Sequence, residues 1–471
     1  MKRIFTILFL LSVFTNLYAQ TPVNGNQSGT WTAANSPYQV TGDITVSAGQ
    51  TLTIEAGVEV NFQGFYKITV LGTLEATGTE TDSIFFTTDN QATGWHGISL
   101  GKSVEGNVTS ADGVCRFLYC KFQYGKTATD DEYPDMNGGA VRMLDSDATY
   151  NNCVFLNNTS LPSEGMGGAI YAINTSSGGG SDNTTFTDCK FIGNIGYSEG
   201  GAIKFTSDLG SVITRCEFIN NTTSNGGGAI MFYSVIDTKM INCLFANNSS
   251  NYSNGGALET LGNGNSIFLK NCTMVGNEAV NGSGGALALY YGSADFVNCI
   301  VYNNTSQYDD DNVYIDAGGG TGTVNYCDIA MPEYNTTGAN NIETDPLFVD
   351  ANSGDYHLTE NSPCIDAGTD IGLEYVGIAP DMGCYEYGAS SNIAKTEPGN
   401  LLINPNPASS FIKIETGNYN IETVEISDLS GKKIMDVTEQ NMLDISNLPN
   451  GVYIIKIKTD KKNYTRKLIK S

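Results

Sequence analysis

Short segments rich in β-forming residues, separated by glycine, asparagine and serine, recur along most of the chain. Residues 229–233 and 286–290 are typical, since each follows a Gly-Gly pair and is only five residues long. Side chains that alternate with a period of two between such turn-forming residues predict strands rather than amphipathic helices. We therefore expect an all-β protein.

Two motifs repeat within this pattern. Gly-Gly-Ala occupies residues 138–140, 167–169, 200–202, 227–229, 255–257 and 284–286. Between the copies runs Cys-x-apolar-x-x-Asn, which begins at Cys153, Cys189, Cys216, Cys243, Cys272 and Cys299 and ends at Asn158, Asn194, Asn221, Asn248, Asn277 and Asn304. A repeat every 27 to 33 residues is typical of a solenoid, in which each coil buries its apolar face only against its neighbours. With strands as its elements, the solenoid is predicted to be a right-handed parallel β-helix with two or three strands per coil.

The repeat positions predict which side chains point inward. Cys216 and Phe218 are two residues apart and share the inner face of a strand, which leaves Glu217 on the outer face. Asn221 marks a corner, where asparagine tolerates left-handed backbone and can form hydrogen bonds with the same residue of the next coil. Gly-Gly supplies a tight turn that a Cβ atom would block.

Five segments are expected along the chain. Residues 1–19 combine a basic start, a short apolar core and a small-residue cleavage site, so they predict a signal peptide removed before Gln20. The β-helix is expected over 20–344, a C-terminal cap over 345–387 and a linker over 388–400. Residues 401–471 alternate between strands and Gly or Pro turns, which predicts a small Ig-like β-sandwich. No later stretch approaches the roughly 20 apolar residues of a membrane-spanning helix.

The chain has 11 cysteines, and export would expose them to an oxidising compartment. Stacked cysteines of neighbouring coils would lie about 4.8 Å apart with parallel Cβ vectors, which strains the disulfide dihedral. We therefore predict that the six repeat cysteines are buried free thiols. Cys364 and Cys384 lie outside the column and are the candidates for a disulfide.

Charge is strongly uneven. Residues 20–392 hold 41 Asp and Glu against 11 Lys and Arg, whereas residues 393–471 hold 9 against 11. A segment this acidic repels phosphate backbones, so a nucleic-acid partner is excluded. The charge fits solubility outside a cell or the binding of divalent cations.

Candidate chemistry is sparse. Two acidic loops interrupt the repeat, residues 130–135 and the run Asp309, Asp310 and Asp311. Such oxygen clusters can bind calcium, and a solvated turn is the alternative; no other cofactor is expected. His96 and His357, the only histidines, are expected to be structural.

Basic residues could support lyase chemistry beside calcium. We interpret the basic residues of the central repeats as occupying different positions within the repeat, which argues against one converged catalytic site. These residues are Arg142, Lys190, Lys204, Arg215, Lys239 and Lys270.

The repeat, Gly-Gly-Ala followed by Phe-x-x-Asn, resembles that of the chlamydial polymorphic outer-membrane proteins over about residues 138–304. The resemblance implies a surface β-helix with adhesive roles. Residues 48–98 and 345–387 look like the beginning and end of bacterial parallel β-helix proteins.

The C-terminal residues resemble the sorting domain of type IX secretion cargo in Bacteroidota. The matching positions are Asn404, Pro405, Asn406, Pro407, Gly451, Tyr453, Lys467 and Leu468. The resemblance implies export through the periplasm to the outer cell surface by the type IX machinery. It also implies removal of the domain by a sortase, followed by attachment to lipopolysaccharide or release.

These observations favour a secreted or cell-surface protein that is structural, adhesive or glycan-binding, with an extracellular glycan or a host or cell surface as partner. The alternative is a carbohydrate-active enzyme, a polysaccharide lyase or glycosidase, on the same fold. Repetition of nearly identical coils favours the non-catalytic hypothesis.

Overall fold

The structure is a computed structural model that describes two parts of the chain. The first is residues 20–388 apart from 105–106, 129–132, 161–163, 176–183, 309–311 and 333–334. The second is 402–470 apart from 405–407, 409, 416–419, 428–431, 439, 450 and 461–462. The predicted signal peptide 1–19 and nearly all of the linker 388–400 lie outside the described residues. Contacts divide the chain into two compact units, with the boundary between Gly388 and Ala389.

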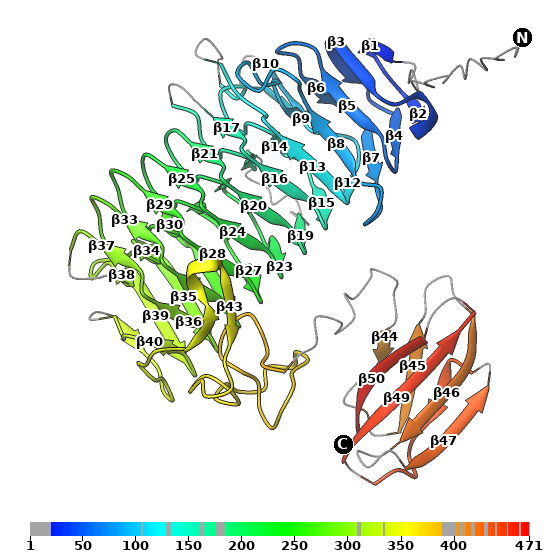
Figure 1. Cartoon of the computed structure of the whole chain (residues 1–471), viewed down its shortest axis with the longest axis vertical. Helices are drawn as coiled ribbons and strands as arrows, with labels where there is room; N and C mark the ends of the chain where they lie inside the picture. The colour runs from blue at the N-terminus through cyan, green and yellow to red at the C-terminus, as the bar shows by residue number, and fades with distance from the viewer. Residues whose placement is uncertain are drawn as a thin grey trace, which may run out of the picture. The chain divides into compact units, whose positions relative to one another are not determined.

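The first unit is a parallel β-helix whose coils stack along one axis (Figure 1). A central coil has four strands rather than the two or three expected: β22 (Ile203–Thr206), β23 (Val212–Thr214), β24 (Glu217–Ile219) and the two-residue β25 (Thr222–Thr223). Each pairs in parallel with its equivalent in the next coil, β26 (Ile230–Tyr233), β27 (Thr238–Ile241), β28 (Leu244–Ala246) and β29 (Ser249–Ser250). The fourth strand was missed because it is short and polar.

Equivalent strands of successive coils stack into four columns, and the remaining strands extend these columns. The Gly-Gly-Ala strands are continued by β9 (Ile98–Leu100), β14 (Val141–Leu144), β18 (Ile170–Ile173), β30 (Leu258–Leu261), β34 (Leu287–Leu289) and β38 (Val313–Ile315). The cysteine strands are continued by β8 (Ile84–Thr87), β13 (Cys120–Gln123), β16 (Val154–Leu156), β20 (Lys190–Ile192), β32 (Thr273–Val275), β36 (Ile300–Tyr302) and β40 (Asp328–Ile329). The short column holds β17 (Thr159–Ser160), β21 (Ile195–Gly196), β33 (Glu278–Ala279) and β37 (Thr305–Ser306).

The other column and the first coils complete the solenoid. The twelve-stranded column also contains β2 (Gly29–Trp31), β4 (Thr51–Glu55), β7 (Thr73–Thr77), β12 (Cys115–Leu118), β15 (Ala148–Asn151), β19 (Thr185–Thr187), β31 (Ser266–Lys270), β35 (Gly292–Val297), β39 (Gly320–Asn325) and β41 (Thr336–Thr337). The first coils use β1 (Thr21–Asn26), β3 (Tyr38–Val46), β5 (Glu59–Phe62) and β6 (Ile68–Val70). The nine-residue β3 pairs with both β5 and β6, and so joins the Gly-Gly-Ala and cysteine columns into one sheet.

The core register is the predicted one. Phe218 is fully buried and Glu217 faces outward in β24. The ring of Phe218 stacks on Phe191 and Phe245 of the adjacent coils, at centroid separations of 4.7 and 4.9 Å. Stacked rings of this kind continue along the axis, because parallel in-register pairing places equivalent residues above one another.

Buried asparagines form a hydrogen-bonded ladder at one corner. The Asn221 side chain donates from Nδ2 to Asn248 Oδ1 and to Phe191 O, both at 2.9 Å. Its Oδ1 accepts from the backbone N and the Nδ2 of Asn194. The pattern repeats along the column, so each amide satisfies the buried backbone of its neighbours.

The Gly-Gly pairs allow close approach between coils. Gly227 has φ +66°, a left-handed conformation, and a Cβ on Gly228 would lie 2.0 Å from Gly256 O of the next coil. Both glycines are therefore required, the first by its backbone conformation and the second by the neighbouring carbonyl.

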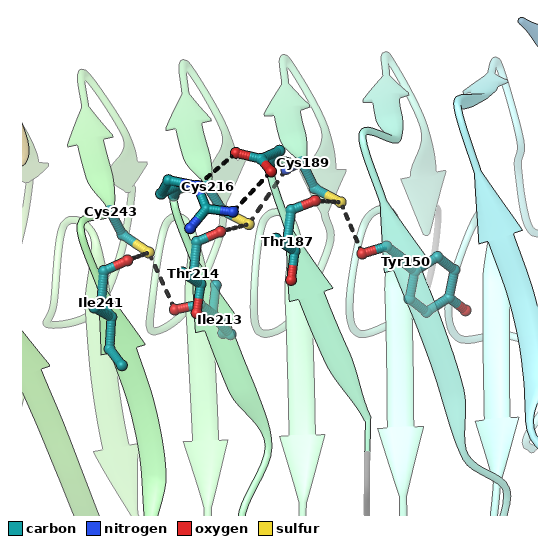
Figure 2. Close-up of polar contacts among 10 residues, drawn as sticks. Tyr150, Thr187, Cys189, Ile213, Thr214, Cys216, Ile241 and Cys243 are labelled. Carbon is teal, nitrogen blue, oxygen red and sulfur yellow. Dashed lines mark hydrogen bonds and ion pairs between the residues drawn. The ribbon is translucent and has the colours of Figure 1, made fainter. Parts of the chain in front are cut away.

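The cysteine column consists of buried free thiols (Figure 2). Cys189 Sγ donates to Thr187 O at 3.3 Å and to Tyr150 O at 3.5 Å. Cys243 repeats the pattern with two backbone carbonyls of β27 and β23. Burial raises the pKa of the Cys189 thiol well above its usual value, so the reactive thiolate is suppressed.

The disulfide expected between Cys364 and Cys384 does not form in the structure, where both are free. Cys364 packs with Ile300 and Met382, whereas Cys384 packs in a separate cluster with Leu244 and Tyr356. Spacing alone could not show that the two thiols enter different clusters.

Residues 345–388 form a strap along the side of the coils rather than a lid over the end of the core. The strap contains β42 (Phe348–Asp350), the 3₁₀ turn Ala351–Ser353 and β43 (Asp355–Leu358). Tyr356 packs on Leu244 and Val275, outward residues of β28 and β32, and Figure 1 shows β43 beside β28. Cys384 N also donates to Thr273 Oγ1 at 3.0 Å.

The second unit contains two antiparallel sheets. One comprises β44 (Leu402–Asn404), β45 (Phe411–Glu415) and β48 (Met442–Asp444); the other comprises β46 (Ile421–Ser427), β47 (Lys433–Thr438), β49 (Gly451–Thr459) and β50 (Asn463–Lys470). Ile412 and Leu443 of the first sheet share one core with Val424 and Ile455 of the second. This is the small β-sandwich predicted from the alternating strands.

Candidate binding face

The outer surface of the Gly-Gly-Ala strands carries an unusual set of side chains. The second residue of each strand points outward, and parallel pairing stacks these residues in one column: Arg142, Tyr171, Lys204, Met231, Glu259, Ala288 and Tyr314. Arg142, Lys204 and Glu259 are nevertheless 0 to 2% exposed. The segment between each short fourth strand and the next Gly-Gly-Ala-column strand is here called the arm. Described arm residues lie against the three side chains: Asp135 and Asn137 contact Arg142, Glu199 contacts Lys204, and Gly226 faces Glu259.

The alignment corrects one sequence interpretation. Arg142 and Lys204 occupy the same repeat offset, two residues after the alanine of Gly-Gly-Ala, and not differing offsets. Counting from the motif would have revealed the alignment. Their burial was not visible, because it depends on the path of the arms.

Arg142 fastens the first arm to the solenoid. Its Nη1 donates to Asp135 O at 3.0 Å and to Asn137 O at 3.2 Å, and its Nε lies 3.5 Å from Asp135 Oδ1. Lys67 Nζ lies 2.5 Å from the other oxygen of Asp135. Burial acts to raise the pKa of Asp135, but the charges of Arg142 and Lys67 outweigh it and hold the pKa below its usual value.

Lys204 is held in a similar way two coils further on. Its ammonium pairs with the Glu199 carboxylate of the arm and lies 5.2 Å from the centre of the Tyr233 ring. Burial lowers the pKa of Lys204, and the charge of Glu199 opposes that shift. The pair therefore fixes this arm on β22, the strand that directly follows it in the chain.

Among the described residues, Glu259 has no such counter-ion in contact. Its Oε2 is buried without a hydrogen-bond donor among the described residues and faces Gly226, where an added Cβ would lie 2.0 Å from it. Burial raises the pKa of Glu259 to about 8; the charge of Glu199 raises it further and Lys204 opposes the shift. At neutral pH the side chain is largely a carboxylic acid.

Exposed tyrosines flank this column on both sides. Tyr197, Tyr252 and Tyr308 lie on arms, and Tyr233 and Tyr291 lie at or beyond the ends of the Gly-Gly-Ala strands. Tyr252 is 72% exposed and Tyr308 is 57% exposed. We name the column and these five tyrosines the tyrosine face.

The other candidate residues fall elsewhere. Asp309, Asp310 and Asp311 lie outside the described residues, so calcium binding there stays a prediction. In the part of the chain that the structure describes, no group of three His, Cys, Asp or Glu residues is arranged to hold a metal ion. His96 stacks on Phe65, while the exposed His357 stacks on Tyr385.

The sorting-signal residues are distributed over the second unit. Asn404 ends β44, whereas Gly451 and Tyr453 lie in β49, and Tyr453 is paired with Leu468 of β50. The Tyr453 hydroxyl donates to Pro449 O at 2.8 Å and Leu468 is buried. Lys467 also lies in β50, and Pro405, Asn406 and Pro407 fall outside the described residues.

Comparison with known protein families gives two matches. Residues 402–471 match the secretion system C-terminal sorting domain. Residues 152–173 and 215–232 match the Chlamydia polymorphic membrane protein repeat, and both segments join a cysteine strand to a Gly-Gly-Ala strand. No curated protein matches the chain.

The helices among the described residues are single 3₁₀ turns, and none is long or apolar enough to span a membrane. The sorting domain places the protein among type IX secretion cargo. The chain is thus a secreted or cell-surface parallel β-helix protein that is similar in its repeats to polymorphic membrane proteins and carries a C-terminal type IX sorting domain.

Proposed function

We propose that the solenoid is a structural or adhesive rod on the outer cell surface, with glycans or other cell-surface molecules as its ligands. The observation that carries this proposal is the tyrosine face, whose exposed tyrosines recur along the coils of a protein sorted to the cell exterior. A repeated surface can make many similar weak contacts with a ligand. Such contacts favour attachment, whereas catalysis needs a single centre.

An adhesion assay tests this function. Cells that export the full chain should adhere to a glycan-coated or cell-coated surface more strongly than cells that export only residues 389–471 behind the same signal peptide. The second strain controls for the secretion route and for the sorting domain. Equal adhesion by both strains would refute the proposal.

A carbohydrate-active enzyme is the second candidate, and Glu259 is the observation that favours it. A carboxyl with a raised pKa is what a glycosidase needs as general acid. However, the Glu259 carboxyl lies beneath Gly226, where a glycosidic oxygen has no direct path to it. Product released from pectin, alginate or xylan, and lost in Glu259→Gln, would favour the enzyme.

A further inference from the structure

The exposed tyrosines of the tyrosine face recur at every second coil. Tyr197, Tyr252 and Tyr308 follow β21, β29 and β37, and each of these strands is two coils from the next. Tyr252 and Tyr308 occupy equivalent positions in their coils. Each lies two residues beyond a strand residue, Ser250 or Ser306, and both serines pair with Ala279 of the coil between them. Tyr233 and Tyr291 repeat the two-coil interval along the opposite edge.

The interval has a physical length. Coils that pair as parallel strands are about 4.8 Å apart, so tyrosines of alternate coils are about 9.6 Å apart along the axis. That is comparable to the length of two sugar rings in an extended polysaccharide. A row of tyrosine rings at this spacing can therefore offer an apolar platform to every second sugar ring of a linear polysaccharide.

Charge limits what can occupy the face. Residues 20–392 carry 41 acidic and 11 basic residues, so the rod repels nucleic acids, acidic glycans, anionic lipid and a second copy of itself. The two basic residues of the column, Arg142 and Lys204, are already paired with carboxylates and buried. The face therefore offers rings and neutral polar groups rather than free cations.

We propose that the tyrosine face binds an uncharged linear polysaccharide that lies along the solenoid axis, with Tyr252 and Tyr308 as the principal stacking platforms. Sugar C–H faces pack on the exposed rings, and the hydroxyls bond with polar groups of the described arm residues. The proposal rests on the proposed surface function and specifies its ligand class.

The test uses the full chain and a panel of uncharged glucans, mannans, xylans and galactans, with alginate and polygalacturonate as acidic comparators. We expect binding to at least one uncharged polysaccharide and none to the acidic ones. Affinity should increase with oligosaccharide length until the chain spans two tyrosines. Absence of binding to the whole uncharged panel, or a preference for the acidic comparators, would overturn the proposal.

Substitutions localise the site. The double variant Tyr252→Ala/Tyr308→Ala should raise Kd at least tenfold without changing the melting temperature, since both side chains are exposed. Tyr387→Ala, at an exposed tyrosine of the strap, is the matched control and should bind normally. Unchanged binding by the double variant would overturn the proposal.

Three further outcomes distinguish failure of this inference from failure of the proposed function. If the rod mediates adhesion but the double variant adheres normally, the polysaccharide inference fails and the adhesive function stands. If the full chain self-associates in sedimentation and the double variant does not, the face is an interface between copies and the inference also fails. If deleting the rod leaves adhesion unchanged, the proposed function itself fails.

Discussion

At the residue scale, Glu259 couples the stability of the solenoid to pH. Its carboxyl is 2% exposed and Oε2 lacks a donor among the described residues. Burial raises its pKa from 4.5 to about 8, so the folded state keeps a proton that the unfolded chain has lost. This contribution to stability is complete below pH 4.5 and is lost as pH rises towards 8.

Glu259→Gln should remove this pH dependence, because glutamine does not titrate. Between pH 5 and 8 the parent protein should lose up to about 4 kcal/mol relative to the variant, at about 1.4 kcal/mol per pH unit. Denaturant unfolding at several pH values measures the difference. The exposed Glu278→Gln is the control and should follow the parent. Parallel pH profiles for Glu259→Gln and the parent would contradict the prediction.

Phe218 tests the core register. Phe218→Ala should destabilise the protein by about 3–5 kcal/mol, because the fully buried ring stacks on rings of both neighbouring coils. Glu217→Gln breaks only the partly exposed pair with Lys190 and should cost less than about 1 kcal/mol. Both values come from denaturant unfolding. A larger loss for Glu217→Gln than for Phe218→Ala would show that the register is wrong.

At the scale of the element, the stability of one corner of the solenoid depends more on the asparagine ladder than on the short fourth strands beside it. The fourth strands contain two residues each, too few to be stable alone. Beside them, each ladder asparagine joins its own coil to both neighbours through buried amide groups. Loss of one amide therefore affects three coils.

Asn221→Ala should destabilise the protein by about 3 kcal/mol or more, because the buried backbone N of Asn194 loses its acceptor and the Nδ2 hydrogen bonds to Asn248 and Phe191 are removed. The adjacent Asn220→Gly is the control. Asn220 is exposed with φ +55°, a conformation that glycine accepts, so this change should be nearly neutral. Hydrogen exchange should show local opening near residue 221 only in Asn221→Ala; protection equal to that of the parent would contradict the ladder's role.

At the scale of the whole molecule, the sorting domain and the β-helix are separate units with separate cores. Such an arrangement allows one unit to be recognised and removed without unfolding the other. The sorting residues Tyr453 and Leu468 belong to the paired strands β49 and β50.

Deleting residues 467–471 should leave the protein in the periplasm, because it removes the end of β50, including the buried Leu468 and Lys470. Cell fractionation measures the location. For the exported parent, mass spectrometry should find a mature chain that begins near Gln20 and ends near residues 388–400. Intact C-terminal peptides on surface-retained protein would contradict processing, and surface display of the deletion variant would contradict the sorting role.

The sequence by itself determined the main features that depend on periodicity. The repeat predicted the solenoid, the inward positions of Cys216 and Phe218, and the asparagine ladder, because parallel in-register stacking places equivalent residues above one another. The sorting domain was evident from its own local motifs.

Tertiary structure alone decided the features that depend on contacts between coils or between distant segments. Leu244 and Ile300 are apolar at an outward position that is polar in earlier coils, which indicates that this face of the solenoid is covered. Only the fold shows that the strap covers this face. The separate environments of Cys364 and Cys384, and the burial of Arg142, Lys204 and Glu259 beneath the arms, were equally hidden. The physical reason is that period-two alternation specifies which side of a strand a residue occupies, whereas burial of an outward residue depends on another segment passing over it.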